Sequence, residues 1–250
     1  MKKTFLLSCL MLAAMPVMAA YTGHVYVDKN KNGVFDQSEK PLAGIKVSDG
    51  LNVVETAADG SFTLPGHERE RFIFITTPSG YKTFNRHYHK IEKKQSGYDF
   101  GLIPYSGRIR KDGSHRYIHI TDTEIFNTEN HADWVNNVRD YARNEQAAFI
   151  IHTGDICYEK GLKAHIKLMN TENMDCPVFY CIGNHDLVKG KYGEELFESI
   201  YGPVYYSFDA GNVHYVVTPM PGGDHAPGYT SDDVCRWLKN DLAHIRPGTP

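Results

Sequence analysis

The chain has 250 residues, enough for one large domain or two ordinary ones with a well-buried core. Its composition is that of an ordinary globular protein, with 41% hydrophobic and 23% charged residues. The formal net charge of -3 becomes -5 when Lys2 and Lys3 of the first 20 residues are left out, which argues against a general nucleic-acid binder.

The first 20 residues have the pattern of a secretory signal peptide. Lys2 and Lys3 precede an apolar stretch over residues 5–18, and Ala19 and Ala20 are small enough to suit cleavage. We therefore predict that the mature protein is exported, to the periplasm or out of the cell. No later segment approaches the roughly 20 apolar residues that a membrane-spanning helix needs, so we expect no transmembrane segment in the mature chain.

Residues 21–104 favour short strands separated by turns. No helical period lies among these strands, so we expect a small all-β sandwich, antiparallel, that binds or positions rather than catalyses. The predicted strands cover residues 24–27, 45–47, 53–56, 61–64 and 72–76.

A candidate calcium loop lies inside this region. Side-chain oxygens fall at positions 1, 3, 5, 9 and 12 of a twelve-residue loop, with glycine at position 6 and a backbone carbonyl at position 7. A hard cation needs six or more oxygens, and the glycine lets the chain fold back around it. The alternative is a solvated loop rich in Asp and Asn. The residues are Asp28, Asn30, Asn32, Gly33, Val34, Asp36 and Glu39.

The stretch from Asp28 through residues 41–50 to Phe62 resembles the repeat-type β modules of bacterial surface proteins related to SdrD B and to carboxypeptidase regulatory domains. This resemblance implies a structural or positioning role and supplies no catalytic residue. Residues 105–116 are polar, basic and glycine-containing, and we predict that they form a linker to a second domain over residues 117–250.

In this second domain, predicted strands alternate with predicted helices. Strands are expected at residues 117–121, 147–153 and 178–182, with helices at 128–146 and 159–170 between them. We expect Trp134, Val138, Tyr141 and Ala142 to form the stripe of the first helix that lies on the sheet. His165 is expected to be a packed or surface residue of the second helix.

Polar residues follow each of these three strands. Asp122 ends the first, Asp155 the second, and the tetrad 183–186 the third. Because βαβ crossovers align the carboxyl ends of parallel strands, these residues are expected at one edge of the sheet. Carboxylate and amide oxygens at one edge predict a site for hard metal ions, whereas the tetrad alone is equally compatible with a polar turn.

The three blocks Asp122-Thr123-Glu124, residues 154–158 and Gly183-Asn184-His185-Asp186 resemble those of the calcineurin-like metallophosphoesterases. The resemblance implies an αββα sandwich and a two-metal site that activates a bridging water against small-molecule phosphomonoesters or phosphodiesters. By residue, Asp122 would bind one metal, Asp155 would bridge both, and Asn184 would bind the second. His185, oriented by Asp186, would stabilise or protonate the leaving oxygen.

The first block departs from the family pattern. Glu124 stands where the family usually has histidine, and a carboxylate there favours manganese, iron or magnesium, with zinc as a further candidate. Tyr158 lies where the purple acid phosphatases have a tyrosine that binds ferric iron, although an aromatic packing residue is the alternative. His225 is a candidate rim residue or substitute metal ligand.

The region after Asp186 is predicted to contain a helix near residues 196–201, a hairpin over 204–208 and 213–218, and a helix over 231–245 capped by Ser231. The sequence ends at Pro250 before the family's further histidines, so we expect a truncated product or an incomplete metal shell. The alternative to an enzyme is a non-catalytic exported binding protein with a relic phosphoesterase domain.

Other candidate residues are expected to be structural. Free buried thiols are predicted for Cys157 and Cys181, because the spacing of the cysteines does not demand disulfides. His119 is predicted to lie in the core, and His214, on a strand, is predicted to be structural.

Overall fold

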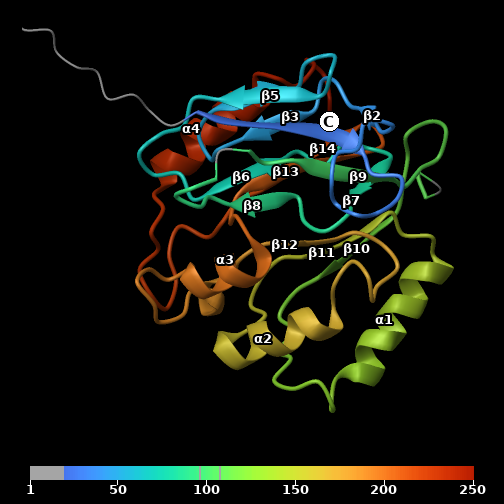
Figure 1. Cartoon of the computed structure of the whole chain (residues 1–250). Coiled ribbons are helices and arrows are strands. Elements are labelled where there is room, and N and C mark those ends of the chain that lie inside the picture. Colours follow the sequence, from blue (N-terminus) through green and yellow to red (C-terminus); the bar gives the residue numbers. More distant parts are fainter. Residues whose placement is uncertain (1–19, 96, 107) are drawn as a thin grey trace, which may run out of the picture.

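The computed structural model describes residues 20–95, 97–106 and 108–250 (Figure 1). Apart from Ala20, the predicted signal peptide lies outside the described residues. In the part of the chain that is described, no helix is long and apolar enough to cross a bilayer. The N-terminal strands, blue to green in Figure 1, lie above the parallel strands and the helices of the middle of the chain.

Within the described residues, the segment 21–104, called the β module below, forms strands and no helix. The sequence predicts β5 with its observed bounds and β1, β3, β4 and β6 with shifted ends, and it misses the other four. The missed strands contain Lys, Gly or Pro, which have low strand propensity, and form by pairing with distant strands. The strands are β1 (Tyr21–Val27), β2 (Lys40–Pro41), β3 (Lys46–Ser48), β4 (Val53–Glu55), β5 (Ser61–Leu64), β6 (Phe72–Ile75), β7 (Tyr81–Thr83), β8 (Tyr88–Lys90) and β9 (Phe100–Pro104).

The β module contains two sheets. One has the order β2-β1-β9-β7, with β5 also paired to β1, and the other has the order β4-β3-β6-β8. Val25 and Leu102 of the first sheet and Val47, Ile73 and Ile75 of the second are buried in one hydrophobic cluster. β1 and β9 run parallel, so the prediction of a purely antiparallel module is wrong.

Residues 117–250, called the α/β part below, contain a parallel sheet and an antiparallel hairpin. The sheet has the order β10-β11-β12, and the hairpin pairs β13 with β14. The predicted strands and helices are present with shifted ends, together with one short 3-10 helix that the sequence did not predict. They are β10 (Tyr117–Ile120), α1 (Ala132–Asn144), β11 (Phe149–His152), α2 (Tyr158–Leu168), β12 (Val178–Tyr180), the short 3-10 helix η1 (Asn184–Asp186), α3 (Glu195–Tyr201), β13 (Tyr206–Ala210), β14 (Val213–Val217) and α4 (Ser231–Leu242).

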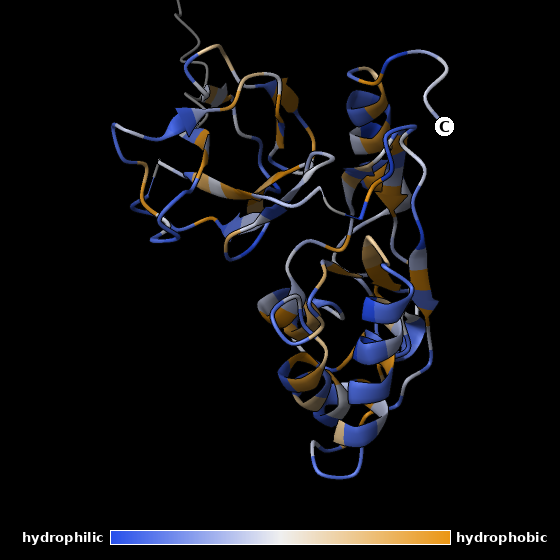
Figure 2. Cartoon of the chain, turned by 90° about the vertical axis from the view of Figure 1, so that its right-hand side faces the viewer, coloured by the Kyte–Doolittle hydropathy of each residue, from blue (hydrophilic) through white to orange (hydrophobic). Residues whose placement is uncertain are grey.

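The buried face of α1 differs from the predicted one. Val135 and Ala142 are buried, whereas Trp134 and Tyr141 are exposed. The inward stripe therefore follows Val135, Val138 and Ala142 at i, i+3 and i+7, so that two large aromatic residues were wrongly assigned to it. α1 comes to the front in Figure 2 and is mostly hydrophilic, as expected for a helix with one narrow buried stripe.

The N-cap of α4 is also displaced from the prediction. Thr230, rather than Ser231, accepts the N–H of Asp233, and Asp233 in turn accepts the N–H of Thr230. This reciprocal pair satisfies two of the N–H groups that a helix start leaves without partners. Trp237 of α4 is fully buried, whereas Leu242 is half exposed.

The hairpin packs on the parallel sheet through aromatic side chains. The rings of Phe179 on β12 and Phe208 on β13 are stacked, with centroids 3.6 Å apart. Phe149 on β11 meets Phe208 edge to face at 5.0 Å. The hairpin therefore lies over one face of the sheet, while Val135 and Ala164 of helices α1 and α2 are buried with side chains of the sheet in a separate cluster.

The β module and the α/β part share a hydrophobic core. Phe72 and Phe74, on one side of β6, are buried in one cluster with Phe208 and Trp237, whereas the alternate residues Ile73 and Ile75 face the core of the β module. β6 is therefore buried on both faces. Since burial of large aromatic side chains dominates the energetics of such contacts, we expect the two parts to be stabilised together.

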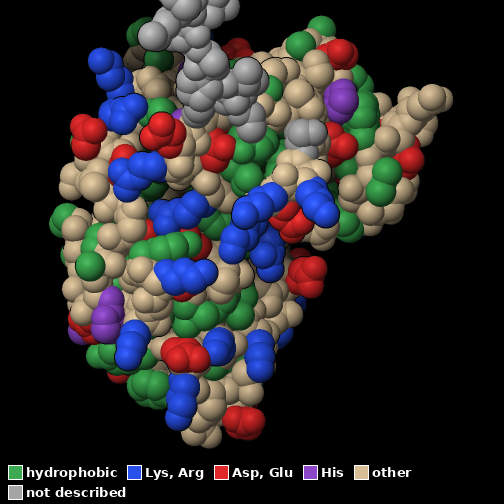
Figure 3. All heavy atoms as spheres, turned by 60° about the vertical axis from the view of Figure 1, so that its left-hand side comes forward, with side chains coloured by type: hydrophobic (Ala, Val, Ile, Leu, Met, Phe, Trp, Pro, Cys, Tyr) green, Lys and Arg blue, Asp and Glu red, His purple; other side chains and the backbone are tan. Residues whose placement is uncertain are grey.

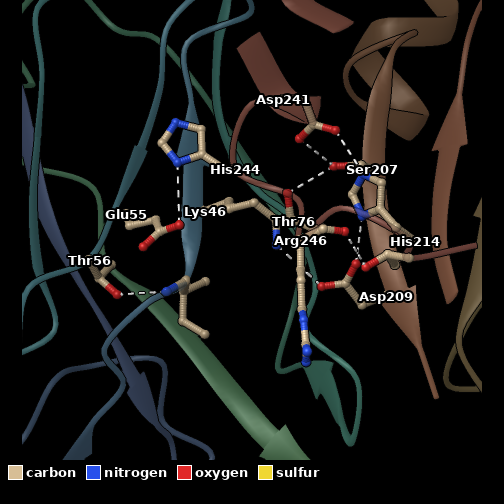
Figure 4. A network of polar contacts seen from close by, with 12 residues as sticks. Lys46, Glu55, Thr56, Thr76, Ser207, Asp209, His214, Asp241, His244 and Arg246 are labelled. Atoms are coloured by element: carbon tan, nitrogen blue, oxygen red, sulfur yellow. Dashed lines mark hydrogen bonds and ion pairs between the residues drawn. The ribbon is translucent and has the colours of Figure 1, made fainter. Parts of the chain in front are cut away.

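A buried polar network also joins the two parts (Figure 4). The ring of His214 lies 2.6 Å from Asp209 and 2.8 Å from Asp241. The hydroxyl of Ser207 donates to Asp241 and lies 2.9 Å from that of Thr76 in the β module. Burial opposes the charge on His214, but the hydrogen bonds to both carboxylates outweigh it and raise its pKa to about 9. His214 is therefore structural, as predicted.

Candidate active site

The carboxyl ends of β10, β11 and β12 meet at one edge of the parallel sheet. The backbone N–H of Asp122 donates to the carbonyl of Gly154 at 3.1 Å. The backbone N–H of His185 donates to Oδ1 of Asp155 at 3.1 Å. Asp155 therefore lies between the first and third strand ends.

Two glycines make this close approach possible. A Cβ on Gly154 would lie 2.4 Å from the nitrogen of Gly183, and a Cβ on Gly183 would lie 2.2 Å from Oδ1 of Asp155. Either contact is far below van der Waals distance. The glycines of the second and third motifs are therefore needed to bring Asp155 against the Asn184-His185 turn.

The backbone at this edge is strained. A positive φ is uncommon outside glycine and costs on the order of 1–3 kcal/mol for each residue, and such strain concentrates at functional sites. Most of the non-glycine residues with positive φ in the described ranges follow β10 or β11. These are Asp122, Glu124, Asp155, Cys157 and Tyr158, with φ of 52°, 45°, 52°, 79° and 53°.

The donors at this edge suit hard metal ions. Asp122, Glu124 and Asp155 offer carboxylates and Asn184 offers an amide oxygen. Among the residues that the structure describes, none of the three carboxylates pairs with Lys or Arg, so their charge is left for a cation to neutralise. The three do not approach within 4.8 Å of one another as a group, so metal binding would draw them together.

His185 is oriented by Asp224. Its Nδ1 lies 2.9 Å from Oδ2 of Asp224, in the loop before α4. This hydrogen bond, with the nearby charges of Asp224, Asp155 and Asp186, raises the pKa of His185 above its ordinary value, although desolvation opposes the shift. A protonated ring with Nδ1 held in this way leaves Nε2–H free to donate.

Asp186 does not take the predicted role of orienting His185. Its buried carboxylate accepts the N–H of Cys157 at 2.8 Å and the N–H of Gly183 at 2.9 Å. Burial raises the pKa of Asp186, and these backbone hydrogen bonds partly offset the shift. Asp186 thus ties the second motif to the third, because the 3-10 turn η1 directs its side chain inward while His185 points outward.

Cys157 and Cys181 are free thiols, as predicted, although only Cys157 is fully buried. Burial, strengthened by the carboxylates of Glu124 and Asp186, raises the pKa of Cys157 to about 12. A thiol that stays protonated is a poor nucleophile, so Cys157 is not suited to covalent catalysis.

Tyr158 and His225 lie at the rim of the site. Both line a cavity of about 220 Å³ together with Asp224 and Leu187. The hydroxyl of Tyr158 lies 3.5 Å from Nδ1 of His185, and the side chain is 53% exposed, so the interpretation of Tyr158 as a packing residue is wrong. The position of His225 agrees with a rim residue.

Sequence reasoning missed Asp224 and His152. From the sequence, only the neighbouring His225 was a candidate in the loop of Asp224. Nothing in the sequence links Asp224 to His185. His152, fully buried at the end of β11, lies 2.9 Å from the hydroxyl of Thr123 and so supports the first motif. His119 is exposed rather than buried, because β10 is an edge strand of the sheet, and it contacts Thr153 at 2.8 Å.

The candidate calcium loop is closed by its own polar groups. Asp28, which is buried, accepts the N–H groups of Asn32 and Gly33. Glu39, also buried, accepts the N–H groups of Lys29 and Asp36. Gly33 has a φ of 72°, so the glycine supplies the turn that its position predicts.

A further cluster of ligand-type residues lies in the β module. Asp49, His67 and Glu70 form the one group in the described residues whose three ligand atoms lie within 4.8 Å of one another. Nε2 of His67 contacts the carbonyl of Asp49 at 3.1 Å, and its Nδ1 faces the N–H of Arg69 at 3.2 Å. Since both ring nitrogens have partners in the fold, the cluster is explained without an ion.

A parallel sheet with acidic residues at consecutive strand ends, covered by helices and joined to an antiparallel hairpin, defines an α/β protein with a candidate metal centre. Residues 115–240 match the model of the calcineurin-like phosphoesterases, and residues 29–104 match the model of the N-terminal part of calcineurin-like phosphoesterases. The chain belongs to the calcineurin-like phosphoesterase family. No curated protein matches it in sequence.

The family match accounts for both parts of the chain. Metal-dependent hydrolysis of phosphoesters is the activity of the class, with divalent metals as its cofactors. The β module matches the N-terminal part of the same class of enzyme. Its resemblance to bacterial surface modules remains a prediction.

Proposed function

We propose that the chain hydrolyses small-molecule phosphomonoesters or phosphodiesters at the carboxyl ends of β10, β11 and β12, with two metal ions. The observation that carries this proposal is the approach of Asp155 to His185 beside Asp122 and Gly154. It puts carboxylates that have no Lys or Arg partner among the described residues next to an imidazole held in place. Carboxylates alone would make a binding site, and the imidazole adds the means to assist a leaving group.

Each residue has a role in this proposal. Asp122 and Glu124 would hold the first metal, Asp155 would bind both, and Asn184 would hold the second. Bound metals would supply Lewis-acid chemistry, polarising the phosphoester and activating a water at neutral pH. His185, protonated and oriented by Asp224, donates its Nε2 hydrogen to the leaving oxygen. Asp186 holds the turn that presents Asn184 and His185.

The α/β part is proposed to have the αββα layering of its family. Burial of Val135 and Ala164 beneath one face of the sheet, and the hairpin and Trp237 over the other, support this order of layers. On the basis of the first 20 residues, we also propose that the protein is exported, to the periplasm or out of the cell. The absence of general nucleic-acid binding likewise remains a prediction from net charge.

A ferric site that uses Tyr158 is the second candidate. It is favoured by the exposure of Tyr158 beside His185, because a half-exposed phenol at the mouth of a metal site is available as a ligand. Such a site would give a purified protein with iron and a visible charge-transfer colour. A colourless, iron-free protein that is active with manganese would exclude it.

Calcium binding by residues 28–39 is proposed as a structural role of the β module. Buried Asp28 and Glu39 have no Lys or Arg partner among the described residues, and Asp36 accepts from the amide groups of Asn30 and Asn32. A cation would replace these donors and neutralise the acids. A titration calorimetry experiment with no heat of calcium binding at millimolar concentration would remove this proposal.

The activity is tested with nitrophenyl phosphate and bis(nitrophenyl) phosphate after loading the protein with manganese, iron, magnesium or zinc. We expect hydrolysis of one ester class by the wild type and a loss of at least 100-fold in Asp155→Asn, with Asp232→Asn, an exposed acid on α4, as the matched control. Absence of hydrolysis and of bound metal would favour the alternative of a non-catalytic binding protein.

A further inference from the structure

Two arginines of the β module, Arg69 and Arg71, contact residues of the α/β part. Nη2 of Arg71, directly before β6, lies 2.9 Å from Oε1 of Glu194 and 3.2 Å from Oε1 of Glu198. Its guanidinium also lies 4.6 Å from the ring centroid of Tyr192. Lys and Arg side chains gather across the middle of the face that Figure 3 shows.

The acids that Arg71 contacts need its charge. Glu194 is fully buried and Glu198 nearly so, and Arg71 is the one Lys or Arg that pairs with them in the described part of the chain. A buried carboxylate that loses its partner is strongly destabilised or takes up a proton. The carbonyl of Arg71 accepts the N–H of Ile91, so its backbone is fixed within the β module.

Both polar backbone atoms of Gly228 have partners that involve these arginines: its N–H bonds to Glu194, which pairs with Arg71, and its carbonyl bonds to Arg69. Glu194 accepts the N–H of Gly228 at 2.9 and 3.1 Å with its two oxygens. Arg69 donates to the carbonyl of Gly228 at 3.0 Å and pairs with Asp233. A Cβ on Gly228 would lie 3.0 Å from Oε1 of Glu194, which shows how closely the loop is pressed against that carboxylate.

The loop that ends at Gly228 carries the partner of the candidate catalytic histidine. The N–H of Gly193, next to Glu194, donates to the carbonyl of Ala226 at 2.8 Å. At the other end of the loop, the N–H of Asp224 donates to the carbonyl of Asn184 at 3.1 Å, and its carboxylate contacts His185. The ion pair between Arg71 and Glu194, the hydrogen bonds from Gly228 to Glu194, and the short backbone segment 224–228 thus connect Arg71 with the partner of His185.

We propose that Arg71 and Arg69 are positioning residues through which the β module holds residues 221–228, and with them Asp224, against His185. The β module is then a required part of the active site, since the loop is anchored on it. The catalytic consequence rests on the proposed function. The anchoring of the loop does not, and it is measured separately.

Hydrogen exchange on the full, manganese-loaded chain tests the anchoring. Arg71→Ala should raise the exchange rate of the amides in residues 221–229 at least 10-fold, while β1 and β9, remote from the contact, keep their wild-type rates. Arg69→Ala, which removes a more exposed side chain, should act in the same direction with a smaller effect. Arg116→Ala, which removes a surface pair with Glu145, is the matched control and should change nothing in this loop.

Kinetics with nitrophenyl phosphate test the catalytic consequence. Arg71→Ala should lower kcat at least 10-fold and change KM less than 3-fold, and Arg71→Lys should recover part of the loss. In a background of Asp224→Asn, Arg71→Ala should have little further effect, because both changes remove the same support from His185. A general loss of stability would instead reduce activity equally in both backgrounds.

Wild-type exchange in residues 221–229 of both Arg71→Ala and Arg69→Ala would overturn the proposal. So would an additive effect of Arg71→Ala and Asp224→Asn on kcat. If Arg71→Ala fails to fold, Arg69→Ala decides by the same two measurements. A wild type that hydrolyses no ester would refute the proposed function while the exchange experiment still decides the anchoring.

Discussion

The Nδ1 atom of His185 lies 2.9 Å from Oδ2 of Asp224, and the two side chains come from segments 39 residues apart in the sequence. Asp224 therefore takes the place that the tetrad sequence assigns to Asp186. The pair joins the third strand end to the loop before α4. It makes that loop part of the candidate active site.

Replacing Asp224 by Asn should lower turnover without unfolding the protein. The amide keeps the size of the side chain but loses the charge that holds a protonated His185, so kcat should fall by about 10- to 100-fold. Steady-state kinetics and urea unfolding check this. A wild-type kcat in Asp224→Asn would contradict the role of Asp224.

Replacing Asp186 by Asn should act on stability instead. The carboxylate accepts two backbone N–H groups, and an amide can accept in one direction only, which leaves a buried N–H facing an NH₂ group. The free energy of unfolding should fall by about 1–3 kcal/mol. Urea unfolding beside Asp224→Asn as the matched amide variant measures it, and equal stability of the two variants would refute the assignment.

The shared core predicts that the β module and the α/β part unfold together. Phe74→Ala should reduce the free energy of unfolding by about 3–5 kcal/mol, since the ring packs against Trp237 in the common cluster. Phe126→Ala, which truncates an exposed ring, should change it by less than about 0.5 kcal/mol. Circular dichroism and tryptophan fluorescence should report one transition, and two separate transitions would contradict the shared core.

His214 predicts a loss of stability at alkaline pH. Its pKa of about 9 in the folded chain lies above the ordinary value of 6.5, so its contribution is complete below pH 6.5 and disappears as the pH rises through 9. The free energy of unfolding of His214→Gln should be about 2 kcal/mol lower than that of the wild type at pH 6, and this difference should shrink progressively up to pH 9.5. Urea unfolding at these pH values tests this, with His244→Gln as a control that removes a more exposed imidazole from the same junction (Figure 4). A difference in the free energy of unfolding between wild type and His214→Gln that stays constant with pH would contradict the raised pKa of His214.

The residues at the strand ends were predictable from the sequence, because each directly follows its strand along the chain. Asp122, Asp155 and Asn184 each follow an apolar run, and parallel pairing fixes where such runs end. β6 was predicted as a strand, but the burial of its second face was not predicted. That face is covered by Trp237 and Phe208, which lie far along the chain from β6. Sequence periodicity does not reveal such distant partners.

The partner of His185 was missed for the same reason. Asp186 is the nearest acid in sequence, whereas the tight turn after Gly183 sends it inward, towards the N–H of Cys157. The aromatic residues of α1 were misassigned because Trp134 and Tyr141 fit a helical period as well as Val135 and Ala142 do. Only the position of α1 on the sheet separates the two stripes.

The central claim is that Asp155, held between the strand ends, binds metal. Calorimetric titration of manganese into the metal-free protein, beside Asp155→Asn, tests it most directly. The account predicts that the wild type binds about two equivalents of manganese and that Asp155→Asn loses both of these sites. The Asp232→Asn control should bind manganese as the wild type does. Identical binding curves for wild type and Asp155→Asn would contradict the account.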